Sequence, residues 1–411
     1  MKYAKLLERF LKYVKVDTQS DPNSKTFPST EKQKNLGKIL VEELKEIGLK
    51  DAYMDEYGYV YATLEANVEN PYTIGLIAHM DTSPDVSGTD VKPIVHENYD
   101  GSDIKLPAGI TIKVEDNPEL KEKKGETIIT SDGSTLLGAD DKAGIAEIMT
   151  AVEYLVQHPE ILRPRLRIAF TPDEEIGQGV AKFDVEKFGA DFAYTLDGGG
   201  LGEIEDETFC ADSGTVKIKG INVHPGYAKG KMVNAIKIAA EIISRLPKDR
   251  LSPETTEGRE GYLHPNDIKG NVEYVEIFFL FRDFELEKLK EHEKLLQNII
   301  DEVKKEYPKA EIKLEIKESY RNMKYKLMEK PEVVEIAIQA IKMAGIEPKR
   351  TIIRGGTDGA MLSYKGLLTP NLFAGGHNFH SKTEWVSLQD MEKAVDVIIN
   401  LAKLWAEKRK I

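Results

Sequence analysis

Between residues 73 and 78 the chain contains the apolar run Thr73-Ile74-Gly75-Leu76-Ile77-Ala78, which leads directly into His79-Met80-Asp81. Such a run is typical of a strand buried on both faces of an α/β sheet. Two more strands are predicted at 165–171 and 192–196, and acidic residues follow each of them. Because the carboxyl ends of strands in an open α/β sheet form a ligand-binding crevice, we expect a polar site there.

Helices are predicted around these strands. Apolar residues recur at helical spacing in 32–47 and again after Gly138, where Pro159 ends the second helix. Near the C-terminus the pattern predicts helices at 333–344 and 388–406 and strands at 349–353 and 371–374. The segment 88–132 has scattered Pro, Gly and Asp and is expected to be mainly loop.

The pattern changes near Cys210. Strands are predicted at 215–221 and 311–317, helices at 234–246 and 285–307, and one long strand or a pair at 271–284. This order resembles a β-α-β-β-α-β sandwich. We therefore predict a larger α/β domain made of 1–210 and 321–411, with an inserted domain at 211–320 and a hinge near 212–214 and 318–320.

Length and composition limit the classes of protein to consider. A chain of 411 residues favours two domains, and a net charge of −13 makes nucleic acid an unlikely partner. One cysteine permits neither an intrachain disulfide nor a cysteine-based metal cluster. The longest strongly apolar run, 277–281, is far shorter than the ~20 residues that span a bilayer. The charged N-terminal segment lacks the apolar core of a signal peptide, so we expect a soluble cytoplasmic protein without membrane contacts.

Histidines and carboxylates gather at the predicted functional edge. They follow predicted strands or glycine-containing loops, and they are His79, Asp140, Glu174, Glu175, Asp197 and His380. Each one alone is better explained as a polar residue at the end of a strand. The set, flanked by glycines that allow close backbone approach, indicates a metal site.

The types of ligand indicate which metals to expect. Imidazoles and carboxylates without thiolates suit borderline or hard divalent ions, and they argue against a purely structural zinc site. Two histidines and three carboxylates can hold two metals if one carboxylate bridges them. Metals about 3.5–4 Å apart can share a hydroxide nucleophile and polarise a carbonyl, with a nearby glutamate as general base.

Two short motifs suggest a division of roles. Residues i and i+2 of an extended segment point the same way, so Asp81 can accept a hydrogen bond from His79 and fix its tautomer. The alternative is that Asp81 caps the turn 81–84. Glu174 and Glu175 point to opposite sides, so one can bind metal while the other contacts water. The alternative there is a solvated acidic turn that includes Asp173.

Seven motifs carry a family resemblance, namely 79–85 (HMDTSPD), 137–144 (LGADDKAG), 170–175 (FTPDEE), 197–200 (DGGG), 222–226 (NVHPG), 354–359 (RGGTDG) and 377–380 (HNFH). With these motifs the chain resembles the M20 co-catalytic metallopeptidases over essentially its whole length, and within them the tripeptide aminopeptidases. The resemblance implies an α/β, mixed-sheet metallopeptidase domain with an inserted α+β lid domain.

The resemblance also implies roles for individual residues. Asp140 would bridge two divalent ions, expected to be zinc, with cobalt or manganese as alternatives. His79 and Asp197 would complete one site, and Glu175 and His380 the other. Asp81 would orient the histidine and Glu174 would be the general base. Asp141 lies next to the bridging position, and Asp140 is preferred because the family pattern places the ligand two residues before Lys142.

Three further residues match substrate-facing positions of the family, namely His224, Arg282 and Arg354. An arginine can bind the carboxylate of a short peptide with two hydrogen bonds, and a histidine donor can stabilise the oxyanion. The alternative for the arginines is an ordinary ion pair with Asp283 or Asp358. Closure of the inserted domain is expected to bring His224 and Arg282 towards the metals.

His377 departs from the family pattern, because an aromatic residue is usual at that position. Its alternatives are packing at the rim of the site and competition as a metal ligand.

The sequence thus predicts an aminopeptidase that removes the N-terminal residue of tripeptides. Other M20 activities stay open, namely dipeptidase, carboxypeptidase or N-acyl amidohydrolase, because fold does not decide substrate. A catalytically inactive binding protein is the alternative from another class, and the presence of Glu174 argues against it. A peptide-binding receptor would be expected to carry a secretion signal. Some relatives dimerise through the inserted domain, which leaves a homodimer open.

Overall fold

The computed structural model describes residues 2–69 and 71–409, and the chain divides into two compact units. The first unit comprises Met1–Asp206, Tyr325–Thr351 and Thr357–Ile411. The second comprises Glu207–Lys324 with the short segment Ile352–Gly356. Each unit has its own sheet.

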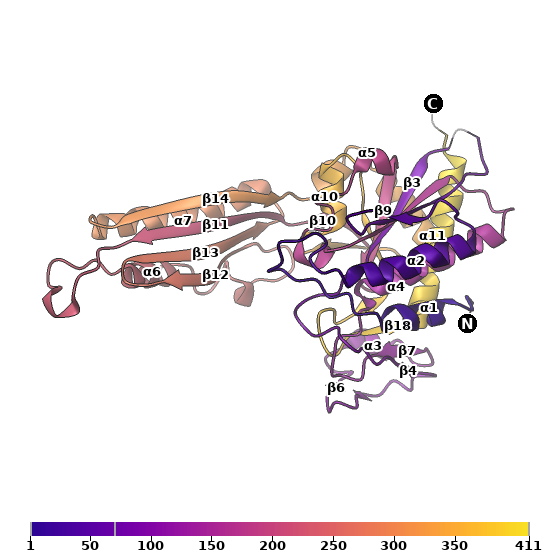
Figure 1. Cartoon of the computed structure of the whole chain (residues 1–411), viewed down its shortest axis with the longest axis horizontal. Helices are drawn as coiled ribbons and strands as arrows, with labels where there is room; N and C mark the ends of the chain where they lie inside the picture. Colours follow the sequence, from indigo (N-terminus) through magenta and orange to yellow (C-terminus); the bar gives the residue numbers. More distant parts are fainter. Residues whose placement is uncertain (1, 70, 410–411) are drawn as a thin grey trace. The chain divides into compact units, whose positions relative to one another are not determined.

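The first unit is built on an eight-stranded mixed sheet with the order β1-β2-β8-β3-β9-β16-β10-β15. Figure 1 labels three of these strands, β3, β9 and β10. Its strands are β1 (Tyr53–Met54), β2 (Val60–Leu64), β3 (Thr73–His79), β8 (Arg165–Thr171), β9 (Phe192–Gly198), β10 (Glu203–Thr208), β15 (Lys349–Ile353) and β16 (Asn371–Phe373). The four central strands β8, β3, β9 and β16 run parallel, whereas β2 is antiparallel to β8 and β10 is antiparallel to β16. This arrangement confirms the predicted mixed-sheet α/β class.

Helices cover the sheet and bury β3 over its whole length. The first unit contains α1 (Leu6–Tyr13), α2 (Gln33–Ile47), α3 (Pro118–Lys121), α4 (Ala139–Gln157), α5 (Val185–Phe188), α8 (Lys324–Leu327), α9 (Glu332–Met343), α10 (Asp358–Tyr364) and α11 (Leu388–Glu407). Helix α4 contacts β3, β9 and α11, and Ile77 and Ala193 of the sheet pack with Phe188 of α5 and Leu362 of α10. Among the residues described, none of the helices is both long and apolar enough to cross a bilayer.

The prediction that 88–132 is mainly loop was wrong in part. This segment contains β4 (Ile94–His96), β5 (Ile104–Lys105), β6 (Thr111–Ile112), β7 (Ile128–Thr130) and α3. Strands β4 and β7 form a small sheet with β17 (Gly376–His377) and β18 (Trp385–Ser387), in the order β17-β18-β7-β4. Strands of two or three residues are too short to produce a readable alternation of apolar and polar residues.

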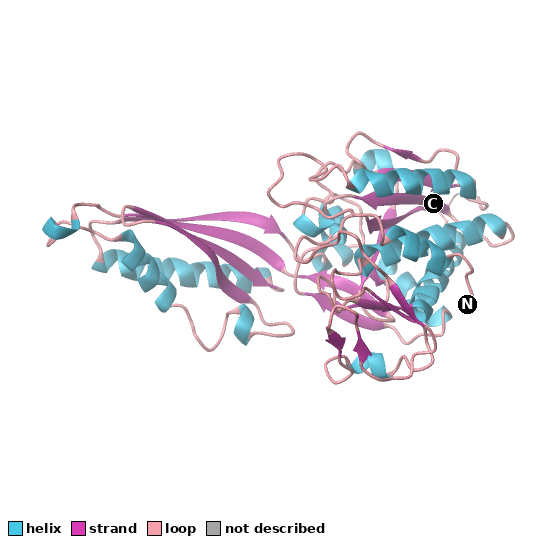
Figure 2. Ribbon diagram, turned by 60° about the horizontal axis from the view of Figure 1, so that its bottom comes forward, coloured by secondary structure: helices cyan, strands magenta, loops and turns pink. Residues whose placement is uncertain are grey.

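The second unit is a four-stranded antiparallel sheet with the order β12-β13-β11-β14. Its elements are β11 (Cys210–Lys219), α6 (Ala235–Ser244), β12 (Tyr262–Gly270), β13 (Tyr274–Asp283), α7 (Leu286–Glu306) and β14 (Glu311–Tyr320), which confirms the β-α-β-β-α-β order. Figure 2 shows the two helices on one face of this sheet. Strand β12 was not predicted, because it contains Pro265 and an irregular register between Pro265 and Asp267.

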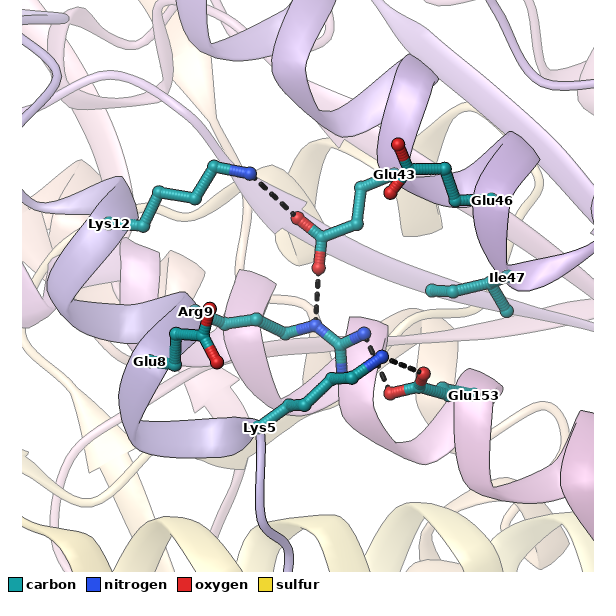
Figure 3. Close-up of a pocket in the computed structure, with 8 residues that line it drawn as sticks. All are labelled: Lys5, Glu8, Arg9, Lys12, Glu43, Glu46, Ile47 and Glu153. Carbon is teal, nitrogen blue, oxygen red and sulfur yellow. Dashed lines mark hydrogen bonds and ion pairs between the residues drawn. The ribbon is translucent and has the colours of Figure 1, made fainter.

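A buried arginine joins the N-terminal helix to the body of the first unit (Figure 3). Arg9 of α1 is only 3% exposed and pairs with Glu43 of α2 and Glu153 of α4, the latter at 2.8 Å. Its Nη1 also donates to Thr150 at 3.1 Å. Lys5 and Lys12 reach the same two carboxylates from the exposed side. One guanidinium therefore links three helices.

We predict that Arg9→Met destabilises the protein by about 2 kcal/mol. Removing one member of a buried ion pair leaves a charge without compensation, although the two lysines reduce the cost here. The measurement is the urea midpoint of unfolding. Lys12→Met is the matched control, because its side chain is 51% exposed and an exposed pair contributes less than about 1 kcal/mol. Equal midpoints for Arg9→Met and the wild type would contradict this role.

Candidate metal centre

Side chains from the ends of three parallel strands converge on His79, the last residue of β3. Its Nε2 lies 2.8 Å from Asp140 Oδ1 and 3.4 Å from Asp197 Oδ1 of β9. Glu174 follows β8 in the short 3-10 helix η1 (Glu174–Ile176), and its Oε2 lies 4.0 Å from the same nitrogen. The sheet edge thus brings these residues together.

Asp140 faces two histidines at once. Its Oδ1 contacts His79, and its Oδ2 lies 3.3 Å from Nε2 of His380. The same nitrogen of His380 lies 2.8 Å from Glu175 Oε2. All five predicted ligands therefore lie in one cluster, although they come from distant parts of the sequence.

Two groups within this cluster have a geometry that suits a cation. One consists of His79, Asp140 and Glu175, and the other of His79, Asp141 and Asp197. Asp141 is fully buried, and its Oδ2 accepts the backbone N–H of His79 at 3.0 Å. The other oxygen of Asp141 and Oε1 of Glu175 have no hydrogen-bond partner in the described part of the chain. Buried orphan carboxylate oxygens fit a site built for divalent ions.

Asp81 contacts the His79 ring with both its main chain and its side chain. The Nδ1 of His79 lies 3.0 Å from the backbone carbonyl of Asp81 and 3.4 Å from its carboxylate. The buried carboxylate accepts the backbone N–H groups of Glu174 at 3.0 Å and Glu175 at 3.2 Å. Asp81 therefore holds the imidazole through its main chain and the turn that bears both glutamates through its side chain.

Burial and mutual repulsion shift the pKa values of the carboxylates. Burial, and then the charge of Asp197, raises the pKa of Glu174 well above its usual range. Burial, and then the charge of Asp140, raises the pKa of Glu175 to about 8. Burial likewise raises the pKa of Asp197 to about 6. Packing so many anions into a desolvated space is unfavourable unless positive charge is supplied.

The histidines partly supply that charge. Hydrogen bonds to Asp140 and Glu175 raise the pKa of His380 to about 11. Burial alone would lower the pKa of His79, but its carboxylate neighbours raise it well above its usual value. Burial would also raise the pKa of Asp140, yet hydrogen bonds from the two histidines lower it below its usual range. A divalent cation would take over the role of these protons.

Three residues that the sequence did not single out position the backbone of the cluster. Asp173, with a left-handed φ of 59°, accepts the backbone N–H of Ser29 at 2.6 Å and the amide of Gln33 at 2.7 Å, which fixes the turn before Glu174. The side chain of Asn371 accepts the backbone N–H of Asp197 at 3.1 Å. Such partners are brought together only by the folded chain, so no local pattern reveals them.

The third is Glu384, whose buried carboxylate accepts three backbone N–H groups from the loop that carries Asp140. Burial raises the pKa of Glu384 to about 7, while these N–H groups act in the opposite direction. The only signal in the sequence is its place four residues after His380.

The three predicted substrate-facing residues belong to the second unit. His224 is exposed, and its Nδ1 accepts the backbone N–H of Gly226 at 3.1 Å. This bond places the proton of a neutral imidazole on Nε2, where it forms a hydrogen-bond donor. His224 therefore has the tautomer that an oxyanion donor requires.

The two arginines do not form the ion pairs offered as alternatives. Arg282 donates to the carbonyls of Asp212 at 3.1 Å and Phe281 at 2.8 Å, and it lies over the ring of Tyr320. The carboxylate of Asp283 instead contacts His292 at 3.0 Å.

Arg354 is likewise held by main-chain oxygens. It donates to the carbonyls of Gly258 at 2.7 Å and Glu260 at 2.8 Å and stacks over Phe209. The carboxylate of Asp358 instead accepts the Thr171 hydroxyl at 2.9 Å.

His377 packs against an aromatic ring. Its imidazole stacks on Trp385 with 4.0 Å between centroids and 11° between planes. Burial lowers its pKa to about 4, so the ring is neutral. Neither of the cation-compatible groups found among the described residues includes it. These contacts agree with packing at the rim.

Comparisons with known proteins give consistent results. A family model described as "Peptidase dimerisation domain" (M20_dimer) matches residues 207–311. A peptidase T from Clostridium perfringens (strain 13 / Type A) is 54% identical over 405 residues, covering 98% of this chain and 100% of the relative. A peptidase T from Geobacillus sp. (strain WCH70) is 53% identical over 406 residues, with 98% and 99% coverage.

Solved structures share the fold at lower identity. The aminopeptidase PepT from Bacillus cereus has a TM-score of 0.76 at 24% identity, and a tripeptidase from Staphylococcus aureus has 0.77 at 24%, each with 98% of both chains covered. A dinuclear metal-binding peptidase of the M20 family from Bacillus subtilis has a TM-score of 0.66 at 15% identity, again covering 98% of both chains.

The geometry predicts that Asp140→Asn and Asp141→Asn differ in metal binding. Asp140 contacts both histidines, so Asp140→Asn should weaken zinc binding by more than about 100-fold, beyond the loss typical of an outer-shell change. In Asp141→Asn the amide oxygen can still accept the N–H of His79, so two ions should remain bound. The measurement is calorimetric titration of chelator-treated protein with zinc. If Asp140→Asn bound two ions and Asp141→Asn lost one, the roles assigned to Asp140 and Asp141 would be reversed.

Proposed function

Because the chain belongs to the peptidase T family of the M20 metallopeptidases, we propose that it is a two-metal aminopeptidase that removes the N-terminal residue of tripeptides. The observation that carries this proposal is the position of Asp140 between His79 and His380, within a cluster of buried carboxylates. The relatives named peptidase T match essentially the whole chain, which supports the same activity here.

The proposed ligands divide between two ions. Asp140 would be the carboxylate shared by both ions, His79 and Asp197 would help to hold one of them, and Glu175 and His380 the other. Asp140 is favoured over Asp141 because its two oxygens face the two histidines separately, whereas one oxygen of Asp141 already accepts a backbone N–H. Imidazole and carboxylate ligands suit zinc, and cobalt or manganese are the alternatives.

Glu174 is the proposed general base. When bound, the two ions would lower the pKa of water and polarise the scissile carbonyl. Glu174 accepts a proton from the water as the water oxygen adds to the carbonyl carbon. It then donates that proton to the leaving nitrogen as the C–N bond breaks. Its carboxylate lies beside the proposed ligands, with Oε2 4.0 Å from Nε2 of His79, so it is placed to take up and return this proton.

Asp81 is proposed to fix the positions of Glu174, Glu175 and His79 relative to one another. Its carboxylate binds the backbone of Glu174 and Glu175, and its main-chain carbonyl binds His79. One residue therefore couples the placement of the base to that of two ligands. Pre-organisation of this kind lowers the cost of reaching the reactive arrangement.

The second unit is proposed to recognise the rest of the peptide. The Nε2–H of His224 is suited to donate to the oxyanion. Carbonyl oxygens and aromatic rings hold Arg282 and Arg354 in fixed orientations, and a fixed guanidinium can form charge-assisted hydrogen bonds to a C-terminal carboxylate. The Nη groups of Arg354 donate to Gly258, Glu260 and Thr256, so its Nε–H is the donor proposed for this carboxylate. This role is separate from that of the metal ligands.

The zinc-loaded protein is predicted to cleave free tripeptides much faster than dipeptides or N-blocked tripeptides. A free amino terminus defines an aminopeptidase, and the arginines should favour a free carboxylate over a C-terminal amide. The measurement is kcat/KM for each peptide. For Arg354→Met, the ratio of kcat/KM for a tripeptide with a free carboxylate to kcat/KM for its C-terminal amide should fall by roughly 10-fold. This is the effect expected when one charge-assisted hydrogen bond is lost.

Rates that are equal for the blocked and the free tripeptide would exclude aminopeptidase activity. They would favour another M20 hydrolase.

Glu174→Gln is predicted to lower kcat by about 10²–10⁴-fold, the range expected for loss of a general base. The substitution keeps the size of the side chain and changes no proposed ligand, so two ions should remain bound. The measurements are kcat for a tripeptide and the metal content of the same preparation. Full hydrolysis by a metal-loaded Glu174→Gln variant would overturn this role.

A further inference from the structure

Glu384 binds the main chain of the loop that carries Asp140. Its Oε2 accepts the N–H groups of Leu137 at 2.7 Å and Gly138 at 2.8 Å, and its Oε1 accepts that of Asp140 at 3.1 Å. The residue is only 1% exposed, so these bonds form away from water. A buried carboxylate with three N–H donors is a strong and directional anchor.

The loop needs such an anchor because it departs from helical geometry. Helix α4 begins at Ala139, yet Asp140 has φ −81° and ψ 104° and Asp141 has φ −119° and ψ 32°. Gly138 is left-handed with φ 83° and has no side chain to cap the helix. The first N–H groups of a helix have no partners within it. Glu384 supplies the acceptors from a residue more than 240 positions away in the chain.

The same hairpin also carries a proposed ligand. Strands β17 and β18 pair antiparallel, and the connection between them contains His380 and Glu384. The stacked rings of His377 and Trp385 lie opposite each other across this pair. His380 contacts the Asp140 side chain at 3.3 Å while Glu384 binds the Asp140 main chain. The hairpin therefore holds both the side chain and the main chain of Asp140.

From this geometry we infer that Glu384 is a positioning residue for the metal centre. It sets the backbone of Asp140 relative to His380, and so it sets the geometry of the carboxylate shared by the two sites. The inference rests on the proposed two-metal function. It adds a residue that touches neither metal nor substrate and acts through Asp140.

Glu384→Gln tests the inference with little change in size. An amide has one acceptor oxygen, so its NH2 group must face either the N–H of Asp140 or those of Leu137 and Gly138. Zinc affinity, measured by competition with a chelator, should fall about 10–100-fold for at least one ion, as for other outer-shell changes. The visible absorption spectrum of the cobalt-substituted protein should also change, because it reports ligand geometry.

Glu147→Gln is the matched control. Glu147 lies on the same helix α4, is fully buried, and neither of its oxygens has a hydrogen-bond partner among the described residues. Among the described residues, no hydrogen bond or ion pair links Glu147 to a proposed ligand. The zinc affinity and the cobalt spectrum of Glu147→Gln should therefore match those of the wild type. Glu384→Asp is the second variant, for the case in which Glu384→Gln does not fold. It keeps the charge but withdraws the carboxylate by one methylene, and its zinc affinity should also fall.

The outcomes separate this inference from the proposed function. A wild-type protein that binds fewer than two ions would overturn the two-metal function, and this inference with it. The wild type could instead bind two ions while Glu384→Gln or Glu384→Asp keeps the wild-type zinc affinity and cobalt spectrum. That result would overturn only the role of Glu384. Reduced affinity in the Glu384 variants and unchanged affinity in Glu147→Gln would support it.

Discussion

The repulsion between buried carboxylates at the end of the parallel strands is the constraint on which the first unit depends. Asp140, Glu174, Glu175 and Asp197 lie within a few ångströms of His79, and burial raises the pKa of three of them. Such an arrangement is costly in a folded chain unless cations or protons balance it. The surrounding structure fixes these carboxylates through backbone hydrogen bonds, so the chain maintains a concentrated negative charge that a pair of divalent ions can neutralise.

Much of the fold follows from local sequence patterns. The apolar run 73–78 and the strand at 165–171 were found because central parallel strands are apolar on both faces. Strand β12 and the small strands within 88–132 were not found, because Pro265 interrupts the first and the others span two or three residues. The histidines and carboxylates of the site were found because they directly follow strands or glycines. Their converging geometry could only come from the folded chain.

The supporting contacts were harder to predict from sequence. Asp81 was expected to contact the His79 ring with its carboxylate, which lies 3.4 Å from Nδ1, but its hydrogen bonds to the backbone of Glu174 and Glu175 were not expected. The arginines of the second unit were weighed against ion pairs, and both bind main-chain carbonyls. A carbonyl acceptor has no signature in the sequence, since every residue carries one. Glu384 was missed for a similar reason, because the groups that donate hydrogen bonds to it are backbone N–H groups, which also have no signature in the sequence.

The distribution of the site along the chain has a consequence for synthesis. Strand β16 and His380 come from the C-terminal segment, yet β16 lies beside β9, and His380 contacts Asp140 and Glu175. A growing chain that ends before residue 380 holds the carboxylates without their second histidine. The cluster therefore cannot assemble until the segment that carries β16 and His380 has been synthesised, long after the strands that carry His79 and Asp197.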